Sequence, residues 1–600
     1  MCGLSAIYSY ASSQIDLSCL KRLHAVIQSR GPDGEGFFAE SSVGLAHRRL
    51  AIIDTSCQAD QPFHWKDRFV LIFNGEIYNY VEIRSQLIGF GYQFRTKSDT
   101  EVLAAAFSHW GPSCQHRLNG MWAFVIWDRL TQQLFCSRDR FGIKPLYWAE
   151  RDQQLFLASE PKQLLAVGIG HKVNIEELSR FLFAGVVGST CETFFADIHS
   201  LSAGHSLTVS PGQPLRIERW YEPSVIDKSA DPDIVSNFLT DSIDLRLRSD
   251  VRVGSCLSGG LDSSAVVMLA SANRIAVSSD PLCCIHARSS DPEGDEFSYA
   301  SLAADSAGAV LHTLTPSIDH FWSNLEEICR IQDEPFGSPS ICMQYFVMQR
   351  ARASGCIVML DGQGADEVLL GYTKYMVLAL SHAWQTGGLR QLFSTLMNSW
   401  SSNASLTPRT SLQYWIATMF SPMRTARVRR RLPFLKLPLE PIRNLYGAVT
   451  AAATDCNRTQ LLELFQTSLP ALLRYEDRNS MAHSVEARLP FLDYRFVEAA
   501  LSLPVDHKIH NGWSKFPLRT AGILPDAIAW RRSKLGFNAP ERSWIGAYSR
   551  QMLSQVLDSP LIAAIADRSV LARRWHRLDR REQWRLFNVA LWADIYSVRP

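Results

Sequence analysis

The sequence has no Cys-x-x-Cys pair, although 13 of its 600 residues are cysteine. Scattered cysteines in odd number argue against a disulfide framework and against a zinc site. The chain also has no run of about 18 apolar residues, the length that a membrane-spanning helix requires. Its first residues lack the basic flank and the apolar stretch of a signal peptide. We therefore expect a protein of the reducing cytoplasm with no membrane partner.

A strong net charge is also missing, because 61 Lys and Arg residues stand against 59 Asp and Glu residues. The formal balance of +2 gives little reason to expect nucleic acid as a partner. Two local basic runs, at residues 424–431 and 573–581, are the exceptions. The ordinary explanation of such runs is a solvated or salt-bridged surface.

The length of the chain predicts more than one domain, since 600 residues exceed what one hydrophobic core usually organises. Apolar runs at 69–73 and 121–127 predict buried strands that end in turns, the first at Asn74-Gly75. Helical stretches such as 99–110 alternate with them, which favours a layered α/β domain. The pattern breaks near residues 211–214. We predict one domain over 1–210 and a second over 211–600.

Strands and helices alternate at the start of the second domain. The predicted strands cover 251–257, 282–286 and 310–314, and the predicted helices cover 264–272 and 297–307. This alternation is typical of a parallel sheet built from βαβ units, which binds ligands at the carboxyl ends of its strands. Residues 373–459 are rich in Ser, Leu and Trp with helix-like spacing and carry no motif that we can interpret. They are expected to be a helical addition.

The first candidate for chemistry is Cys2. Removal of Met1 would leave Cys2 with a thiol and a free α-amine on one residue. The reference pKa of that amine is about 8, against about 10.4 for lysine, so it can act as a base near neutral pH. A cysteine at position 2 is a weak indication by itself. Three further segments strengthen it.

These segments carry groups that match the three ends of glutamine. Arg49 offers a planar pair of donors suited to a free carboxylate. Asn74-Gly75-Glu76 brings a side-chain amide and an unhindered backbone N–H, the ingredients of an oxyanion hole. Asp99 provides a carboxylate that can hold an ammonium group. Together they predict a site that hydrolyses the glutamine side chain.

With the runs at 30–34 and 140–147, these residues resemble the class II glutamine amidotransferases. The resemblance implies a layered αββα domain of the N-terminal nucleophile type, in which ammonia is released from glutamine. By this resemblance Cys2 is the nucleophile, and Asn74 and Gly75 form the oxyanion hole. Arg49, Glu76 and Asp99 would then bind glutamine.

A second site is indicated by Leu257-Ser258-Gly-Gly-Leu-Asp262-Ser263-Ser264, between a predicted strand and a predicted helix. Backbone N–H groups and a helix N-terminus at such a junction can hold an anion. The run matches neither Gly-x-x-x-x-Gly-Lys-Ser/Thr nor Gly-x-Gly-x-x-Gly. It resembles the pyrophosphate loop of ligases that transfer AMP to a carboxylate.

An acidic loop follows the next buried run, at Asp361-Gly362-Gln363-Gly364-Ala-Asp366-Glu367. Magnesium prefers hard oxygen ligands together with substrate phosphates. Asp262 and Asp366 are therefore predicted to hold Mg2+ from two sides. An acidic loop is ordinarily only solvated, but its place at the end of a strand favours the metal.

The runs at 477–493 and 531–537 complete a resemblance to the glutamine-hydrolysing asparagine synthetase family. It implies a parallel-sheet pyrophosphate-loop domain with helical additions, with ATP and Mg2+ as cofactors and AMP and pyrophosphate as products. Lys534 would neutralise phosphate charge. The residues that the resemblance assigns to ATP are Leu257, Ser258, Gly259, Gly260, Asp262, Ser263, Ile285, Asp361 and Gly362.

One position departs from the family. Some members carry glutamate where this chain has Gln363, which cannot accept a proton from ammonia. Either another group, with Glu486 as the candidate, takes that proton, or the acceptor pocket differs. Ring-closing relatives such as β-lactam synthetase lack the N-terminal cysteine, so Cys2 argues against them.

The partners expected from the sequence are glutamine, ATP and a small carboxylic acid. Aspartate is the leading acid, and another acid, as in natural-product assembly, is the alternative. A catalytically silent scaffold of the same fold is a third hypothesis, which the presence of Cys2, Asp262, Asp366 and Lys534 opposes. A homodimer is left open by the sequence.

Overall fold

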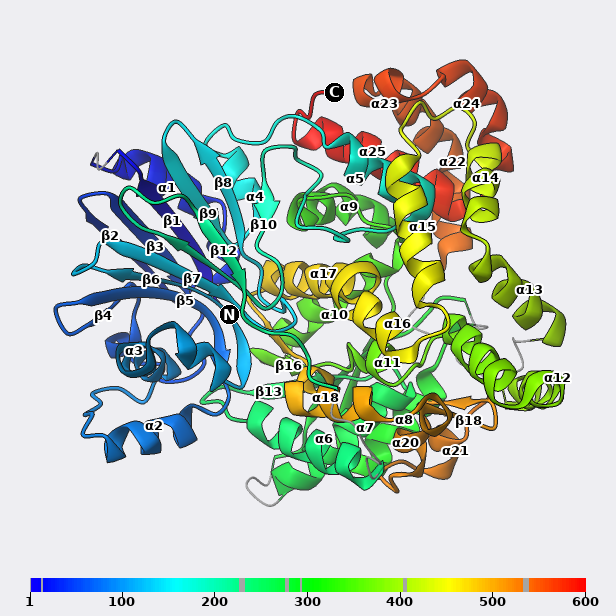
Figure 1. The fold of residues 1–600 in the computed structure, drawn as a ribbon, viewed down its shortest axis with the longest axis horizontal. Coiled ribbons are helices and arrows are strands. Elements are labelled where there is room, and N and C mark those ends of the chain that lie inside the picture. Colours follow the sequence, from blue (N-terminus) through cyan, green and yellow to red (C-terminus); the bar gives the residue numbers. More distant parts are fainter. Residues whose placement is uncertain are drawn as a thin grey trace.

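The structure is a computed structural model that describes residues 2–11, 14–225, 232–275, 280–291, 294–402, 407–532 and 539–600. Figure 1 shows two parts side by side: β-sheets of the N-terminal part on the left and a helix-rich remainder on the right. None of the helices within these ranges is long and apolar enough to cross a membrane.

The N-terminal part contains two antiparallel sheets. The first has the order β10-β8-β9-β1-β3-β2 and the second the order β12-β11-β7-β6-β5-β4. The strands of the first sheet are β1 (Gly3–Ser9), β2 (Gly34–Glu40), β3 (Val43–Arg49), β8 (Tyr147–Arg151), β9 (Gln154–Ala158) and β10 (His199–Ser200). Those of the second are β4 (Phe63–Trp65), β5 (Phe69–Ile77), β6 (Gly120–Asp128), β7 (Gln133–Arg138), β11 (His205–Val209) and β12 (Arg216–Arg219).

The alternating direction of the apolar side chains along β1 explains why the two sheets pack face to face. Leu4 and Ala6 pack against Val70 of β5 between the sheets. Ile7 points to the other face and packs against Leu20 of helix α1 (Leu17–Ala25). Successive strand residues face opposite sides, so a strand covered on both faces is apolar throughout. Helix α3 (Asp99–Trp110) covers the outer face of the second sheet. The expected αββα layering is confirmed.

The predicted turn at Asn74-Gly75 is wrong, because β5 continues to Ile77. Gly75 lies opposite Trp122 of β6 in an unbroken ladder. A Cβ atom at Gly75 would lie 2.1 Å from the carbonyl oxygen of Met121, so only glycine allows the strands to approach this closely. The Asn-Gly pair therefore marks a close contact inside a strand, which its sequence does not distinguish from a turn.

The second part contains a parallel five-stranded sheet with the order β15-β14-β13-β16-β17. Its strands are β13 (Val253–Cys256), β14 (Cys283–Ala287), β15 (Val310–Leu314), β16 (Val358–Leu360) and β17 (Glu486–Arg488). Helices α7 (Leu261–Ile275) and α8 (Phe297–Ala307) lie against one face and α10 (Ser340–Ala353) against the other. Cys284 packs toward α7 and α8, and its neighbour Cys283 packs toward α10.

The order of this sheet reverses at β13. The chain moves outward from β13 to β14 and β15, then returns to place β16 on the other side of β13. In open α/β sheets a crevice forms at the carboxyl ends of the two strands where the order reverses. The loops after β13 and β16 are therefore the expected ligand site, and both carry the predicted ATP residues.

Helices α12 (Met376–Ser402), α13 (Pro408–Met419), α14 (Ser421–Arg431), α15 (Glu440–Ala452) and α16 (Cys456–Leu462) form the insertion after β16. Helix α17 (Leu469–Ala482) then returns and packs against α10 and the N-terminal segment 28–30. The C-terminal helix α25 (Arg580–Ile595) contacts the N-terminal part, where Trp592 lies 5.7 Å from Phe194 between ring centroids. One core cluster thus joins both parts of the chain.

Candidate functional site

Cys2 lies just before β1 and is buried, with 7% of its surface exposed. Its backbone N–H donates to Asn74 Oδ1 at 3.0 Å, and its Sγ lies 3.9 Å from the carbonyl oxygen of Leu50. Burial raises the pKa of the Cys2 thiol, because a thiolate loses solvation there. Attack on an amide therefore requires a nearby base that takes the thiol proton.

Asn74 is fully buried beside Cys2. Because Oδ1 accepts the bond from Cys2, the Nδ2 group points elsewhere, and it has no hydrogen-bond partner among the described residues. A buried donor without a partner is costly unless a ligand satisfies it. An oxyanion formed next to the Cys2 sulfur would do so, which agrees with the predicted roles of Asn74 and its neighbour Gly75.

Three buried carboxyl groups gather near the nucleophile: Glu76 on β5, Asp99 on α3 and Glu486 on β17. Glu76 Oε2 lies 3.7 Å from Arg488 Nη2, and burial together with the charge of Glu486 raises the pKa of Glu76. Burial raises the pKa of Asp99 to about 6, although its Oδ2 accepts a bond of 2.9 Å from the backbone of Ile77. Such a cluster suits a ligand ammonium.

Glutamine binding should weaken below pH 6 if Asp99 holds the ammonium of the substrate. Asp99 is ionised above its pKa of about 6 and protonated below it. Because only the ionised form attracts a cation, the KM for glutamine should rise about tenfold per pH unit below 6. The measurement is the KM of glutamine hydrolysis across this range. The Asp99→Asn variant should flatten that dependence, and a KM that stays constant while kcat falls would remove Asp99 from the binding site.

Arg49, at the end of β3, is held by the loop that follows it. Its guanidinium donates to the carbonyl oxygens of Ser56, at 2.6 Å, and Asp54, and to Asp60 Oδ1 at 2.8 Å. These bonds use three of the five donors of the group. The loop therefore orients Arg49 and leaves two N–H groups for the carboxylate that the sequence assigns to it.

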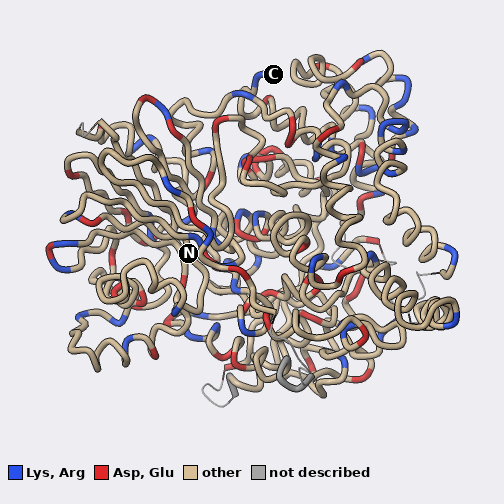
Figure 2. The backbone as a smooth tube through the Cα atoms, viewed as in Figure 1, with Lys and Arg blue, Asp and Glu red and all other residues tan. Residues whose placement is uncertain are grey.

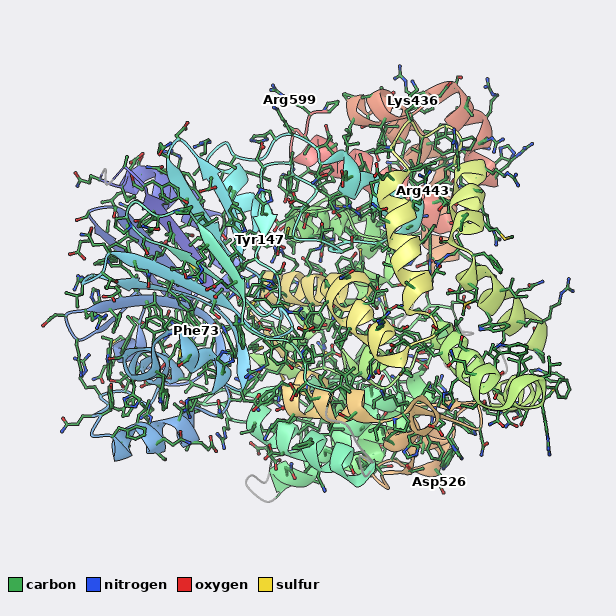
Figure 3. The ribbon with its side chains drawn as sticks, in the orientation of Figure 1. Phe73, Tyr147, Lys436, Arg443, Asp526 and Arg599 are labelled. Carbon is green, nitrogen blue, oxygen red and sulfur yellow. The ribbon has the colours of Figure 1, made fainter. Side chains whose placement is uncertain are left out.

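Arg30 connects the nucleophile to the second part of the chain. Its Nε donates to the carbonyl oxygen of Cys2 at 3.0 Å, and its two other nitrogens form a bidentate pair with Asp477 of α17 at 2.8 and 3.0 Å. The neighbouring Arg478 pairs with Asp333 at 3.0 Å and lies over the ring of Tyr147. Figure 3 labels Tyr147 where the two parts meet. A buried ionic network thus joins Cys2 to α17.

A cavity of about 440 Å3 lies at the carboxyl ends of β13 and β16, where the sheet order reverses. Eight of the nine residues assigned to ATP line it, and Gly259 lies in the same loop behind the surface. Ile285, in the middle of β14, also lines the cavity. The remaining seven are Leu257, Ser258, Gly260, Asp262, Ser263, Asp361 and Gly362.

The loop after β13 closes on itself in a shape suited to an anion. The hydroxyl oxygens of Ser258 and Ser263 lie 2.9 Å apart, and Gly260 N–H donates to Ser258 Oγ at 3.2 Å. Gly259 has a φ of +82°, and a Cβ there would lie 2.7 Å from the backbone nitrogen of Ala300. Helix α7 starts at Leu261, so its N-terminus faces the cavity.

Asp262 and Asp366 face each other across one buried cation. Lys515 Nζ lies 2.5 Å from Asp262 Oδ2 and 2.7 Å from Asp366 Oδ1. Gly371 permits this approach, because a Cβ there would overlap both Asp366 Oδ1 and the Lys515 side chain. Asp262 Oδ1 is buried and has no hydrogen-bond partner among the described residues. The two carboxylates can therefore serve a common positive charge, as a metal site requires.

Several residues that line the cavity were not predicted from the sequence, namely Lys515, Arg519, Arg531 and Gln344. Lys515 stands before the short helix α20 (Phe516–Thr520) in a left-handed conformation, with a φ of +54°. The segment around it carries no motif that would have indicated it. Arg531 donates to the carbonyl oxygen of Gly259 in the phosphate loop at 3.4 Å. It also pairs with Glu296 and lies over the ring of Tyr299, at the start of α8.

The two remaining residues predicted to be catalytic are Lys534 and Glu486. Lys534 lies outside the described residues. Glu486 is fully buried on β17 but lies outside the lining of the cavity, and Arg488 Nε donates to its Oε1 at 2.6 Å. The positive charges of the N-terminus, Arg488 and Lys144 lower the pKa of Glu486 despite its burial. Its neighbour Arg488 lies beside Glu76, one of the residues predicted to bind glutamine.

A different buried carboxyl group contacts two residues of the cavity lining. Glu476 of α17 is 2% exposed and accepts a bond from Gln344, which lines the cavity together with Gln363. It is also in hydrogen-bonding contact with Asp361. Burial and the charge of Asp361 raise the pKa of Glu476 well above that of an exposed glutamate.

Comparison with known proteins agrees with this geometry. The glutamine amidotransferase domain family matches residues 1–221, and the asparagine synthase family matches residues 235–594. The chain belongs to the asparagine synthase family. It is 30% identical over 569 residues to asparagine synthetase [glutamine-hydrolyzing] 1 of Bacillus subtilis, a match that covers 91% of this chain and 88% of that one.

Two further relatives also match most of the chain. A putative asparagine synthetase [glutamine-hydrolyzing] of Mycobacterium tuberculosis is 33% identical over 593 residues, covering 91% of this chain and 89% of the relative. Amidase chry2 of Gibberella zeae is 27% identical over 623 residues, covering 93% and 92%. This member of the asparagine synthase family is a ligase that uses glutamine and ATP for amidation.

Proposed function

We propose that this asparagine synthase family member transfers the amide nitrogen of glutamine to the β-carboxylate of aspartate, with cleavage of ATP to AMP and pyrophosphate. The observation that carries the proposal is the position of α17, which joins the Cys2 site through Asp477 and the ATP cavity through Glu476. Aspartate is favoured because the relatives that match nine-tenths of the chain include several asparagine synthetases.

In the glutaminase half, Cys2 attacks the amide carbon of glutamine. After removal of Met1 the free α-amine takes the thiol proton, close to Asn74 Oδ1, which already accepts the bond from this nitrogen. Asn74 Nδ2 donates to the developing oxyanion. The C–N bond then breaks, the α-ammonium returns its proton to the leaving nitrogen, and ammonia departs. Water hydrolyses the glutamyl thioester left on Cys2 and releases glutamate, while Glu76 and Asp99 hold the substrate ammonium.

In the synthetase half, an oxygen of the acceptor carboxylate attacks the α-phosphorus of ATP and expels pyrophosphate. The loop at Ser258 to Ser263 and the N-terminus of α7 bind the phosphates. Lys515, and by family resemblance Lys534, neutralise their charge. Asp262 and Asp366 would hold Mg2+, which would stabilise the negative charge of the departing pyrophosphate.

Ammonia then attacks the carbonyl carbon of the acyl-AMP and expels AMP. We propose that it travels inside the protein along α17, because ammonia released into neutral water is mostly protonated and loses its nucleophilic lone pair. The Arg30–Asp477 pair holds the glutaminase site against the start of this path.

The attacking ammonia must lose a proton, and Gln363 cannot take it. We propose Glu476 as the acceptor, because it contacts Gln344 and Asp361, two residues that line the cavity. Glu486, the candidate from the sequence, remains the alternative.

The Glu476→Gln variant should lose amide formation about a hundredfold, the contribution of a general base, with either glutamine or ammonium salt. Acid-dependent exchange of pyrophosphate into ATP should persist, since it precedes the attack. A second substitution, Gln363→Glu, should restore turnover by returning a carboxylate to the cavity. Glu486→Gln is the matched control. Normal turnover of Glu476→Gln, with loss in Glu486→Gln, would assign the proton to Glu486 instead.

The acceptor acid is tested by a screen of carboxylic acids for acid-dependent pyrophosphate release. Aspartate should give the strongest signal. A second candidate function, amidation of another acid, is favoured by Gln363 in the cavity lining and by relatives whose names are amidases. Strong pyrophosphate release with another acid, and none with aspartate, would replace the first candidate by the second.

A further inference from the structure

The insertion between residues 368 and 439 contains no Asp or Glu but nine Lys or Arg residues. Over the whole chain about one residue in ten is acidic, with 59 such residues among 600. We call this region the acid-free insertion. Neither the proposed catalytic sites nor their pairing along α17 gives a reason for its composition.

Helix α12 of this insertion exposes a long apolar stripe. Leu389 is 74% exposed, Phe393 67%, Met397 39% and Trp400 49%. Residues spaced three or four apart lie on one face of a helix, so these four side chains form a row. The adjacent face is buried through residues such as Leu396, which pack into the protein. The helix therefore already packs one face against the protein, and the stripe is a second apolar face that is exposed to solvent.

The next two helices add further exposed apolar side chains. Tyr414 is 56% exposed, Ile416 45%, Phe420 52% and Met423 64%. Helix α13 packs against α12 and against α14, so these residues belong to the same helical unit. Single exposed apolar residues are normal, but eight of them in one short region mark an interaction surface.

The same three helices carry exposed cations, namely Arg390 on α12, Arg409 on α13 and Arg427, Arg429 and Arg430 on α14. Two other arginines of α14 have structural contacts, since Arg424 lies over the ring of Tyr446 and Arg431 pairs with Asp579. Figure 2 shows blue and no red along α12 and α13 at the edge of the molecule. Figure 1 places this edge on the side opposite the glutaminase sheets.

We propose that helices α12 to α14 dock the enzyme on an anionic lipid surface. Trp, Tyr, Phe and Met side chains would enter the boundary between headgroups and acyl chains, and the arginines would contact lipid phosphates. Aromatic residues prefer that boundary. None of the described helices is long and apolar enough to cross a membrane, and the proposed contact is with the lipid surface alone.

Charge complementarity selects this occupant over a second copy of the chain. Two copies joined through this face would bring two acid-free cationic surfaces together, which is unfavourable. An acidic protein could neutralise the arginines. The lipid surface is favoured because a row of aromatic and aliphatic side chains set among arginines along helices is the composition of interfacial helices.

The test is flotation of the full-length protein with vesicles of phosphatidylglycerol and phosphatidylcholine in equal parts. The protein should float with these vesicles at low salt, dissociate as salt rises, and fail to float with pure phosphatidylcholine. The triple variant Leu389→Glu, Phe393→Glu, Met397→Glu should lose at least tenfold of the binding. Its ammonia-dependent pyrophosphate release should stay unchanged, which shows that the variant is folded.

The matched control replaces Ile88, Phe90 and Leu130 by Glu, three apolar residues that are 55%, 59% and 75% exposed on the N-terminal part. This control should float like the unchanged protein. The proposal is overturned if the unchanged protein floats with neither vesicle, or if both triple variants float equally. It is also overturned if the protein is a dimer in solution that the α12 variant dissociates, because a second copy would then cover the face.

Discussion

The Cys2→Ala variant is expected to lose glutamine-dependent amide formation by about 10⁴-fold or more, because no other described thiol lies beside Asn74. Its turnover with ammonium salt should remain close to that of the unchanged protein. The reason is spatial: the ATP cavity lies at the carboxyl ends of β13 and β16, and Cys2 does not line it. Rates of amide formation with each nitrogen source measure the effect.

Cys2→Ser is the matched control for this variant, since it keeps the size of the side chain and the bond from the Cys2 nitrogen to Asn74. It should also fail with glutamine and work with ammonium. If Cys2→Ala remains folded and binds ATP but loses ammonia-driven turnover, the division of labour between the two sites is wrong.

The Asp262→Asn and Asp366→Asn variants are expected to lose adenylation on the order of a hundredfold or more, because each removes one charge from the carboxylate pair that faces the phosphates. Glutamine hydrolysis should continue, since Cys2, Asn74 and Asp99 are untouched. Acid-dependent pyrophosphate exchange reports the first effect, and glutamate release reports the second.

Raising the magnesium concentration should partly rescue these two variants if the carboxylates hold the metal. Asp305→Asn, on the exposed side of α8, is a suitable control and should behave like the unchanged protein. Appearance of ADP and phosphate as the coupled products would contradict the adenylation mechanism for this site.

Local signals in the sequence predicted the parallel sheet well. The helix Phe297–Ala307 and the strand Val310–Leu314 have the expected bounds, because periodic apolar residues end there at Gly308. The loops after β13 and β16 were expected to meet, and they line one cavity. In these cases short-range pattern and sheet topology fix the arrangement together.

Contacts between residues that are far apart in the sequence could not be predicted from local patterns. Arg30 and Asp477 are 447 positions apart, and neither residue type indicates a partner. Lys515 meets Asp262 across 253 positions, from a segment without a motif. The exposed stripe on α12 was read as ordinary helical spacing, because periodicity gives the face of a helix but not whether that face is covered.

The central claim is that nitrogen passes inside one chain from glutamine at Cys2 to a carboxylate activated in the cavity at Asp262. Its most direct test is incubation with ¹⁵N-amide glutamine, ATP, Mg2+ and aspartate in the presence of excess unlabelled ammonium, followed by mass spectrometry. The account predicts that the asparagine formed carries mainly the label from glutamine. Asparagine that carries the isotope ratio of the bulk ammonium, or label that appears only as free ammonium, would contradict it.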